Sequence, residues 1–255
     1  MGKIVAIGGG EIGRPKKNGG FYPIETTTID KEIIRLSGKK NPRLLFIPTA
    51  SKDSAGYYEV ITKHFGKKLG CKCDLLYLIK ERPTKKEMQS KILNADIIYV
   101  GGGSTFYMIS TWRRLGVDKL LYRAYMKDII LSGISAGAIC WFRYCTTDSS
   151  PKHGKSNHNL NKMGCLDFVN LTVSPHHITE PDRKPALINI MKKTPGVGIA
   201  LDDYAALEIL GDRYRIITSK KTATVNKVFF KNRKLSYIKL NKNGKFRPLS
   251  ELYSR

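Results

Sequence analysis

Short apolar runs alternate with helix-like stretches along most of this chain, and no other feature restricts its fold as strongly. Such alternation is typical of βαβ units, in which crossover helices cover the faces of a parallel sheet. We therefore expect an α/β fold with a mostly parallel sheet flanked by helices. The strands predicted by the apolar runs are 3–7, 43–48, 74–79, 96–100, 129–134, 171–174 and 197–201.

Helical periodicity and capping signals fill several of the gaps between these strands. Ile61, Phe65 and Leu69 recur at four-residue spacing, which gives a helix one apolar face. Thr84 and Glu87 have the spacing of a capping box, in which each residue satisfies a free N–H group of the other. The helices predicted in this way are 57–69, 84–93, 105–115, 118–126 and 136–142.

The pattern changes near the C-terminus, where 205–210, 213–218 and 227–230 are short runs joined by charged turns. Closely spaced runs of this kind are typical of antiparallel strands. No internal repeat or low-complexity linker divides the chain. We therefore expect a single α/β domain over 1–255 with an antiparallel C-terminal extension, of which the part from 219 to 255 is strongly basic.

Composition and length exclude several classes of protein. The chain has 255 residues, 41% of them hydrophobic and 26% charged, which is enough to bury a core and argues against disorder. Its longest apolar runs, such as 129–131, are far shorter than the roughly 18 residues of a membrane span. The segment 1–7 enters a strand-like run without the apolar region of a secretory signal. We therefore expect a cytoplasmic protein with no membrane partner.

The cysteines indicate neither a disulfide framework nor a zinc site. There are five of them, an odd number, and none has the C-x-x-C spacing of zinc or redox sites. We expect reduced and mostly buried thiols at Cys71, Cys73, Cys140, Cys145 and Cys165.

The positive charge raises the question of nucleic acid. Lys and Arg number 45 against 21 Asp and Glu, for a formal net charge of +24. The excess is spread over the whole chain and is densest after Gly211, and no zinc finger or RNA-binding aromatic motif accompanies it. Specific nucleic-acid binding is therefore not favoured, although a non-catalytic protein that binds a polyanion stays an alternative.

The first glycine-rich segment, Gly8 to Gly13, satisfies the G-x-G-x-x-G pattern of dinucleotide sites. That pattern requires a helix to begin within it, so that the helix N-terminus can hold a pyrophosphate. Here the segment 14–20, which has the composition of a loop, follows instead. We therefore interpret Gly8 to Gly13 as a glycine turn and expect no nicotinamide cofactor.

The second glycine-rich segment, Gly101 to Thr105, follows the strand 96–100 and precedes a predicted helix. Its backbone N–H groups are expected at the carboxyl edge of the sheet, beside a helix N-terminus. Anions and oxyanions bind at such places. A flexible turn capped by Ser104 or Thr105 is the other interpretation.

The third segment, Gly133-Ile134-Ser135-Ala136-Gly137, has the pattern G-x-S-x-G. It stands between the strand 129–134 and a helix-like stretch, which is the setting of a nucleophile elbow. In such an elbow the glycines permit a tight turn, and the serine side chain projects above the sheet. The pattern therefore favours Ser135 as a catalytic nucleophile.

A serine nucleophile needs a base, and His176 and His177 follow the strand 171–174. An imidazole at that strand end could reach Ser135. His153 and His158 could join them in a zinc site, but the helical H-E-x-x-H spacing is missing. We therefore expect no metal.

Two aspartates could orient the base. Asp203 lies just past the strand 197–201, whereas Asp148 lies at the start of an irregular segment, 146–164, that we expect to border the site. Because a triad acid must be held within about half an ångström, the strand end favours Asp203. Both positions stay open on the sequence alone.

Together these motifs resemble the peptidase E family of serine peptidases, which includes dipeptidase E and the cyanophycinases. The segments Val100 to Phe106, Gly133 to Ala138 and Ser174 to His177 match its three signature stretches in order and at similar spacing. The similarity covers roughly residues 1–218. It implies an α/β fold like that of class I glutamine amidotransferases, with Ser in place of the amidotransferase Cys.

The resemblance also implies roles for individual residues. By position, Ser135 is the nucleophile and His176 the general base, and the N–H groups of Gly103 and Ala136 form the oxyanion hole. His177 stands where relatives commonly have an aromatic residue, which leaves open which histidine acts.

The family has two candidate positions for the acid, and these correspond to Asp148 and Asp203. Its members prefer substrates with an aspartate, which implies a cation near the site. Arg183 and Lys184 are the nearest candidates downstream of the histidines, with His177 as a further substrate contact.

The leading hypothesis is therefore a cytoplasmic serine peptidase that hydrolyses short peptides, Asp-containing dipeptides among them, through an acyl-enzyme and without cofactor. A small peptide is the expected partner, and a homodimer stays open. One alternative is a hydrolase of the same fold that acts on an ester or amide other than a peptide. The other is the polyanion-binding protein considered above.

Overall fold

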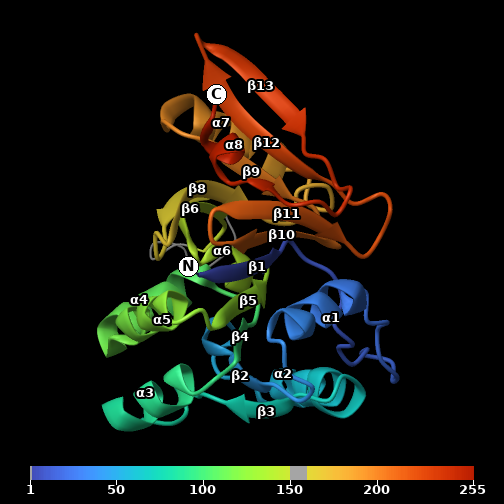
Figure 1. Cartoon of the computed structure of the whole chain (residues 1–255), viewed down its shortest axis with the longest axis vertical. Helices are drawn as coiled ribbons and strands as arrows, with labels where there is room; N and C mark the ends of the chain where they lie inside the picture. The colour runs from blue at the N-terminus through green and yellow to red at the C-terminus, as the bar shows by residue number, and fades with distance from the viewer. Residues whose placement is uncertain (1, 150–159) are drawn as a thin grey trace.

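The computed structural model describes residues 2–149 and 160–255, and their strands form two sheets (Figure 1). The first sheet contains, in spatial order, β14 (Arg247–Pro248), β11 (Arg213–Thr218), β10 (Ala205–Leu210), β1 (Lys3–Ile7), β5 (Ile130–Ile134), β4 (Ile97–Val100), β2 (Arg43–Ile47) and β3 (Lys72–Leu75). The second contains β13 (Lys234–Lys239), β12 (Val225–Lys231), β9 (Gly198–Leu201), β8 (Val169–Ser174), β6 (Phe142–Thr147) and β7 (Asn161–Gly164).

Each sheet combines a parallel centre with antiparallel flanks. In the first sheet, the five strands β1, β5, β4, β2 and β3 are parallel. On the other side of β1, each of β10, β11 and β14 in turn pairs antiparallel with the strand before it. In the second sheet β6, β8 and β9 are parallel, and β7, β12 and β13 are antiparallel. The expected α/β class and the antiparallel C-terminal strands are confirmed.

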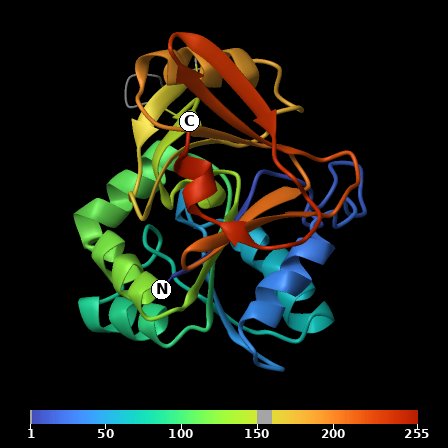
Figure 2. The same ribbon diagram turned by 45° about the horizontal axis from the view of Figure 1, so that its top comes forward.

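Helices cover both faces of the first sheet. In Figures 1 and 2, α4 and α5 lie on one face with α3, and α1 and α2 lie on the other. A further helix, α7, packs on β9 and β12 of the second sheet. The helices are α1 (Thr27–Leu36), α2 (Ala55–Ile61), α3 (Lys85–Leu93), α4 (Thr105–Leu115), α5 (Val117–Met126), α6 (Ala136–Ile139), α7 (Arg183–Lys193) and α8 (Ser250–Tyr253), with a 3₁₀ turn η1 (Thr49–Ser51) and a π-helical segment η2 (Thr62–Lys68).

The core explains why the central strands are apolar at nearly every buried position. Side chains alternate between faces along a strand, so a sheet covered on both sides needs apolar residues throughout. On β1, Val5 and Ile7 belong to the cluster beneath α1 and α2, whereas Ile4 and Ala6 belong to the cluster on the opposite face. That second cluster also contains Val173 and other residues of the second sheet, so one apolar core joins the two sheets.

Local signals place the helix ends. Thr84 and Glu87 form the capping box expected at the start of α3, with both reciprocal hydrogen bonds present. Ser104 caps α4 by accepting from the Tyr107 N–H group, and Gly116 ends that helix with a positive φ of 74°.

Three predicted elements were wrong in extent, and a tertiary contact explains the first. The strand predicted at 74–79 is Lys72–Leu75, because the buried Asp53 carboxylate accepts the N–H groups of residues 78, 79 and 80 and draws the chain out of the sheet. The helix predicted at 136–142 ends at Ile139, and Phe142 already begins β6. Within the predicted loop 146–164, β6 extends to Thr147 and β7 occupies Asn161–Gly164.

The structure also bears on two expectations drawn from composition. All five cysteines are unpaired, four of them buried, as expected. Among the described residues, no helix combines the length and the apolar character that crossing a membrane requires.

Candidate active site

The three signature segments meet where the carboxyl ends of several strands converge. Ser135 follows β5 in the first sheet, while His176 and Asp203 follow β8 and β9, which are neighbours in the second. Because β8 and β9 are parallel, their carboxyl ends lie at one edge of the sheet. The side chains of Ser135 and His176 are therefore brought together from different sheets.

Ser135 occupies a strained turn between β5 and α6. Its φ of 57° and ψ of −116° are rarely adopted by residues other than glycine. The turn is held by hydrogen bonds from Ser135 N–H to Ile7 O, at 3.0 Å, and from the Ala138 N–H group to Ser135 O, at 2.9 Å. This is the geometry of a nucleophile elbow, and it presents the hydroxyl at the sheet edge.

The two glycines of the motif are required by close packing. A Cβ on Gly137 would lie 2.0 Å from the backbone oxygen of Val100, and one on Gly133 would lie 2.5 Å from the backbone oxygen of Gly137. Atoms cannot approach this closely, so only glycine permits the turn to pack against β4.

A continuous series of hydrogen bonds joins Ser135, His176 and Asp203. Ser135 Oγ lies 2.8 Å from His176 Nε2, and His176 Nδ1 lies 2.6 Å from Asp203 Oδ1. Asp203 Oδ2 accepts a further hydrogen bond from the Thr179 hydroxyl, at 2.6 Å. The arrangement can accept the proton of an attacking serine and stabilise the resulting imidazolium.

Electrostatics keep the Asp203 carboxylate charged. Burial raises its pKa, but the hydrogen bonds from His176 and Thr179 outweigh this and hold the pKa below the ordinary value. A carboxylate that stays ionised fixes the imidazole with its proton on Nδ1, which leaves Nε2 to accept from the serine.

Asp148 has a different position. It lies just past the end of β6 and is exposed. Both ring nitrogens of His176 are already engaged, by Ser135 and Asp203. The structure therefore brings Asp203, rather than Asp148, to the imidazole.

The glycine segment after β4 lies directly beside Ser135. A Cβ on Gly102 would lie 3.8 Å from Ser135 Oγ, and Gly103, with a φ of 137°, packs so that its Cβ would lie 2.2 Å from the Ala50 oxygen. In the described part of the chain, the N–H groups of Gly103 and Ala136 donate to no backbone acceptor. Both are available to bind an oxyanion, and Ala136 opens α6, where N–H groups lack helical partners.

Sequence reasoning missed the role of Gly9. A Cβ at this position would lie 1.8 Å from Asp203 Oδ1 and 2.4 Å from His176 Nδ1. The Tyr204 N–H group donates to the Gly9 oxygen at 3.0 Å, which ties the glycine turn to the residue after Asp203. Within the Gly8 to Gly13 segment, Gly9 is therefore packed against the His–Asp pair.

His177 is bonded to a tyrosine rather than to the serine. It is buried, and its Nε2 is hydrogen-bonded to the Tyr237 hydroxyl at 2.5 Å. Burial, together with the charges of Lys184 and Arg183, lowers the pKa of His177 to about 4. His176, not His177, therefore contacts Ser135, and the expected substrate contact at His177 is not supported by its position.

The two cations expected near the substrate, Arg183 and Lys184, contact other parts of the protein. Arg183 is buried, and its guanidinium donates to Glu180 Oε2 at 2.6 Å and to Thr146 O at 3.1 Å, so its charge is used within the protein. Lys184 is exposed and lies over the Tyr237 ring, with Nζ 5.0 Å from the centroid. These contacts do not favour Arg183 as the residue that holds an acidic side chain, which stays a prediction.

The zinc alternative involved His153 and His158, which lie outside the described residues. Over 2–149 and 160–255, no group of three or more His, Cys, Asp or Glu side chains has the arrangement of a metal site.

Comparison of the sequence with known proteins defines its class as a peptidase. A model of peptidase family S51 matches residues 18–217. The chain is 32% identical to the uncharacterized peptidase YgaJ of Bacillus subtilis (strain 168) over 242 residues, which cover 94% of this chain and 97% of that protein. It therefore belongs to peptidase family S51, and the family resemblance found in its motifs is confirmed.

Further relatives agree with this assignment. The uncharacterized peptidase Lmo0363 of Listeria monocytogenes is 30% identical over 164 residues, covering 61% of this chain and 78% of that protein. The crystal structure of a peptidase from an acI-B1 Actinobacterium superposes with a TM-score of 0.71 at 21% identity, covering 97% of each chain. A protein of Listeria monocytogenes EGD-e described as a candidate peptidase E has a TM-score of 0.63 at 20% identity, covering 86% of this chain and 98% of that one. These two structures show the shared fold.

The packing of Gly9 predicts that Gly9→Ala disrupts activity without unfolding the protein. The added methyl group must push apart His176 and Asp203, and a displacement of about 1 Å at such a site can cost on the order of 100-fold in rate. We expect kcat to fall by about that factor, measured on any substrate that the protein turns over. Gly164→Ala is the matched control, since over 2–149 and 160–255 no atom beyond its chain neighbours lies within 4 Å of its Cβ position. Equal activity of both variants would contradict this account.

The environment of His177 predicts an acid-dependent loss of stability. The unfolded chain gains a proton near pH 6.5, whereas the folded protein gains it only near pH 4. Stability from this group is therefore complete above pH 6.5 and lost as the pH falls towards 4, by an amount on the order of 3 kcal/mol. In urea unfolding, His177→Gln should lose less stability over that interval than the parent protein. Parallel pH curves for the two proteins would contradict the assignment.

Proposed function

We propose that this protein is a serine peptidase that hydrolyses short peptides containing an acidic residue through an acyl-enzyme. The observation that carries the proposal is the series of hydrogen bonds from Ser135 through His176 to Asp203. Membership of peptidase family S51 supports the reaction class. The preference for aspartate rests on the resemblance to the peptidase E family.

The first half of the proposed reaction forms the acyl-enzyme. Ser135 Oγ attacks the scissile carbonyl carbon while His176 Nε2 accepts the hydroxyl proton, and the carbonyl oxygen gains a negative charge. The N–H groups of Gly103 and Ala136 are the proposed donors to that oxygen. His176 then gives its proton to the leaving amine as the carbon–nitrogen bond breaks.

The second half releases the product. Water attacks the ester carbon, His176 Nε2 accepts a proton from it, and the same proton returns to Ser135 Oγ as the ester bond breaks. Asp203 keeps the imidazole oriented in both halves and stabilises the imidazolium without itself taking the proton.

The first test is Ser135→Ala, which removes one oxygen from a turn whose backbone is fixed independently. We expect hydrolysis of a peptide panel to fall by on the order of 10⁴-fold or more, with the unfolding transition retained. A fluorophosphonate should also add its mass to Ser135 in the parent protein and to no other serine.

Ser90→Ala, at an exposed position on α3, is the control and should leave turnover unchanged. Undiminished hydrolysis by a folded Ser135→Ala variant would remove Ser135 from the mechanism. Turnover of simple esters without any peptide hydrolysis would favour the non-peptide alternative.

The second test separates the two aspartates. Asp203→Asn keeps the shape of the side chain but favours the wrong imidazole tautomer, so we expect kcat to fall by about 10⁴-fold with little change in stability. Asp148→Asn should affect KM more than kcat, because Asp148 is exposed and both ring nitrogens of His176 are already bonded to Asp203 and Ser135. Steady-state kinetics of both variants on one peptide measure the difference. A large kcat loss for Asp148→Asn with a nearly silent Asp203→Asn would reverse the assignment.

A further inference from the structure

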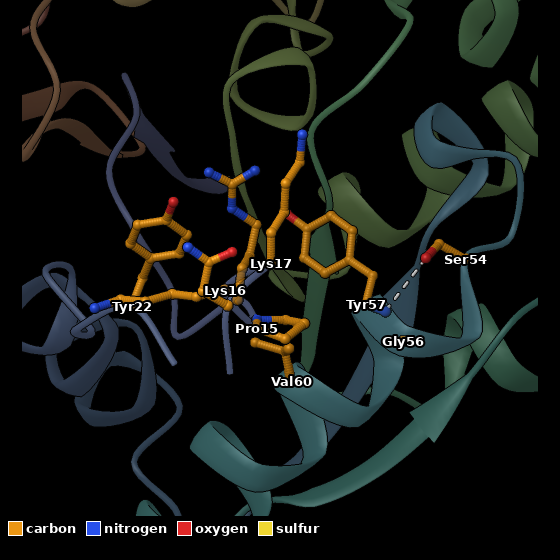
Figure 3. A pocket seen from close by; sticks show the side chains of 10 residues that line it. Pro15, Lys16, Lys17, Tyr22, Ser54, Gly56, Tyr57 and Val60 are labelled. Carbon is orange, nitrogen blue, oxygen red and sulfur yellow. Dashed lines mark hydrogen bonds between the residues drawn. The ribbon is translucent and has the colours of Figure 1, made fainter. Parts of the chain in front are cut away.

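A cavity of about 720 Å³ opens close to the glycine segment that contacts Ser135. Its walls come from the segment after β1 and from the start of α2, and Figure 3 shows their side chains facing one another. Its volume is in the range of pockets that hold small ligands. Five of its lining residues matter for what it can bind: Arg14, Lys16, Lys17, Tyr22 and Tyr57.

The wall that carries the cations is an ordered hairpin, which we call the 12–24 hairpin. Isolated bridges pair Ile12 with Ile24 and Pro15 with Phe21. The Tyr22 N–H group donates to the Arg14 oxygen at 2.8 Å, which fixes the strands of the hairpin next to the cavity. The basic side chains are thus attached to a defined backbone.

The opposite wall connects the cavity to the catalytic serine. The Tyr57 hydroxyl accepts a hydrogen bond from the Gly102 N–H group at 3.2 Å, and Gly102 packs against Ser135. Gly9, which touches the His–Asp pair, precedes the 12–24 hairpin by only a few residues. A ligand in the cavity therefore lies within the span of a short peptide bound at Ser135.

The charge of the cavity is positive and largely uncompensated. Arg14 forms an ion pair with Glu11, but Lys17 has no ion-pair partner among residues 2–149 and 160–255. Lys16 and Arg14 lie over the Tyr22 ring, with Lys16 Nζ 5.4 Å from the centroid. None of the described lining residues carries a carboxylate. The cavity consequently favours an anionic group.

Tyr57 adds a neutral donor to these cations. Burial raises the pKa of Tyr57 to about 12, so its hydroxyl stays protonated at any physiological pH. One lone pair of that oxygen accepts from Gly102, which leaves the O–H group to donate to a ligand. A planar carboxylate, which accepts at two oxygens, fits a donor beside a cation.

We propose that the cavity between the 12–24 hairpin and α2 binds a carboxylate of the substrate, with Lys16 and Lys17 as the residues that determine this specificity. This inference rests on the proposed function and adds the residues that recognise the substrate, in place of Arg183. The carboxylate can be an acidic side chain or the free C-terminus of a short peptide, since the two have the same chemistry.

The test compares Lys16→Met/Lys17→Met with the parent protein on Asp-Leu, Asn-Leu and Asp-Leu amide. We expect kcat/KM for Asp-Leu to fall about tenfold in the double variant, as two exposed charges are lost. Lys86→Met, which removes one exposed charge on α3, should change none of the rates. Thermal unfolding checks that every variant is folded.

Asn-Leu, which lacks the acidic side chain, and Asp-Leu amide, which lacks the free C-terminus, identify the source of the carboxylate. If the double variant and its parent are equal on Asn-Leu, the acidic side chain is the ligand; if they are equal on Asp-Leu amide, the C-terminus is. A parent protein that does not distinguish the three peptides overturns the proposal, and so does an equal loss on all three in the double variant.

Labelling of Ser135 by a fluorophosphonate separates this proposal from the proposed function. If Ser135 is not labelled, the proposed function fails and the inference with it. If Ser135 is labelled but Asp-Leu is not turned over, protection from labelling by the three peptides is measured instead. If protection is the same for the parent and the double variant, the proposal for Lys16 and Lys17 fails while the proposed function stands.

Discussion

The hydrogen bonds of His176 set the constraint that the two sheets must satisfy at the candidate active site. They join a serine at the end of β5 in one sheet to an aspartate at the end of β9 in the other. The two sheets must therefore meet with their carboxyl ends at one place. The connection Asp202 to Tyr204 achieves this, because it leads directly from β9 in the second sheet to β10 beside β1 in the first. Within it, Asp202 accepts from the Thr224 N–H group just before β12, while Asp203 accepts from His176. Adjacent carboxylates thus fix the end of β9 and orient the imidazole.

Bringing so many strand ends together requires close backbone contacts, and this explains the glycines around the site. Gly133 and Gly137 let the elbow pack against β4, and Gly9 leaves room for the His–Asp pair. In each case a methyl group would overlap another atom, most often a backbone atom that cannot move away. The positive φ values of Ser135 and His176 add local strain, which the surrounding hydrogen bonds and core must offset.

Much of the site could be predicted because its signals are local. G-x-S-x-G between a strand and a helix, and histidines after a strand, each follow from a few neighbouring residues. The choice between Asp203 and Asp148 depended on tertiary distance, and strand-end rigidity only favoured one of them. Gly9 was missed because the atoms that exclude its side chain belong to residues far along the chain.

Other parts of the fold were beyond local reasoning for the same reason. A sequence pattern identifies strands but does not assign them to sheets, so the second sheet was not foreseen. Asp53 ends β3 early through hydrogen bonds to residues 78–80, a contact between segments that no periodicity reveals. Arg183 had the right charge for an acidic substrate, but burial and its bond to Thr146 use that charge inside the protein.

The distribution of charge links the core to the chemistry at the surface. Several of the 21 acidic residues are buried, among them Asp30, Asp53, Asp202 and Glu208, whereas most of the lysines are exposed. Burying carboxylates removes negative charge from the surface. The exposed side chains therefore carry most of the excess positive charge behind the net charge of +24. A positive field of this kind raises the local concentration of anionic ligands at any open cavity, and salt weakens it. The whole surface therefore already attracts carboxylates. The basic 12–24 hairpin adds a fixed place at which one carboxylate can bind.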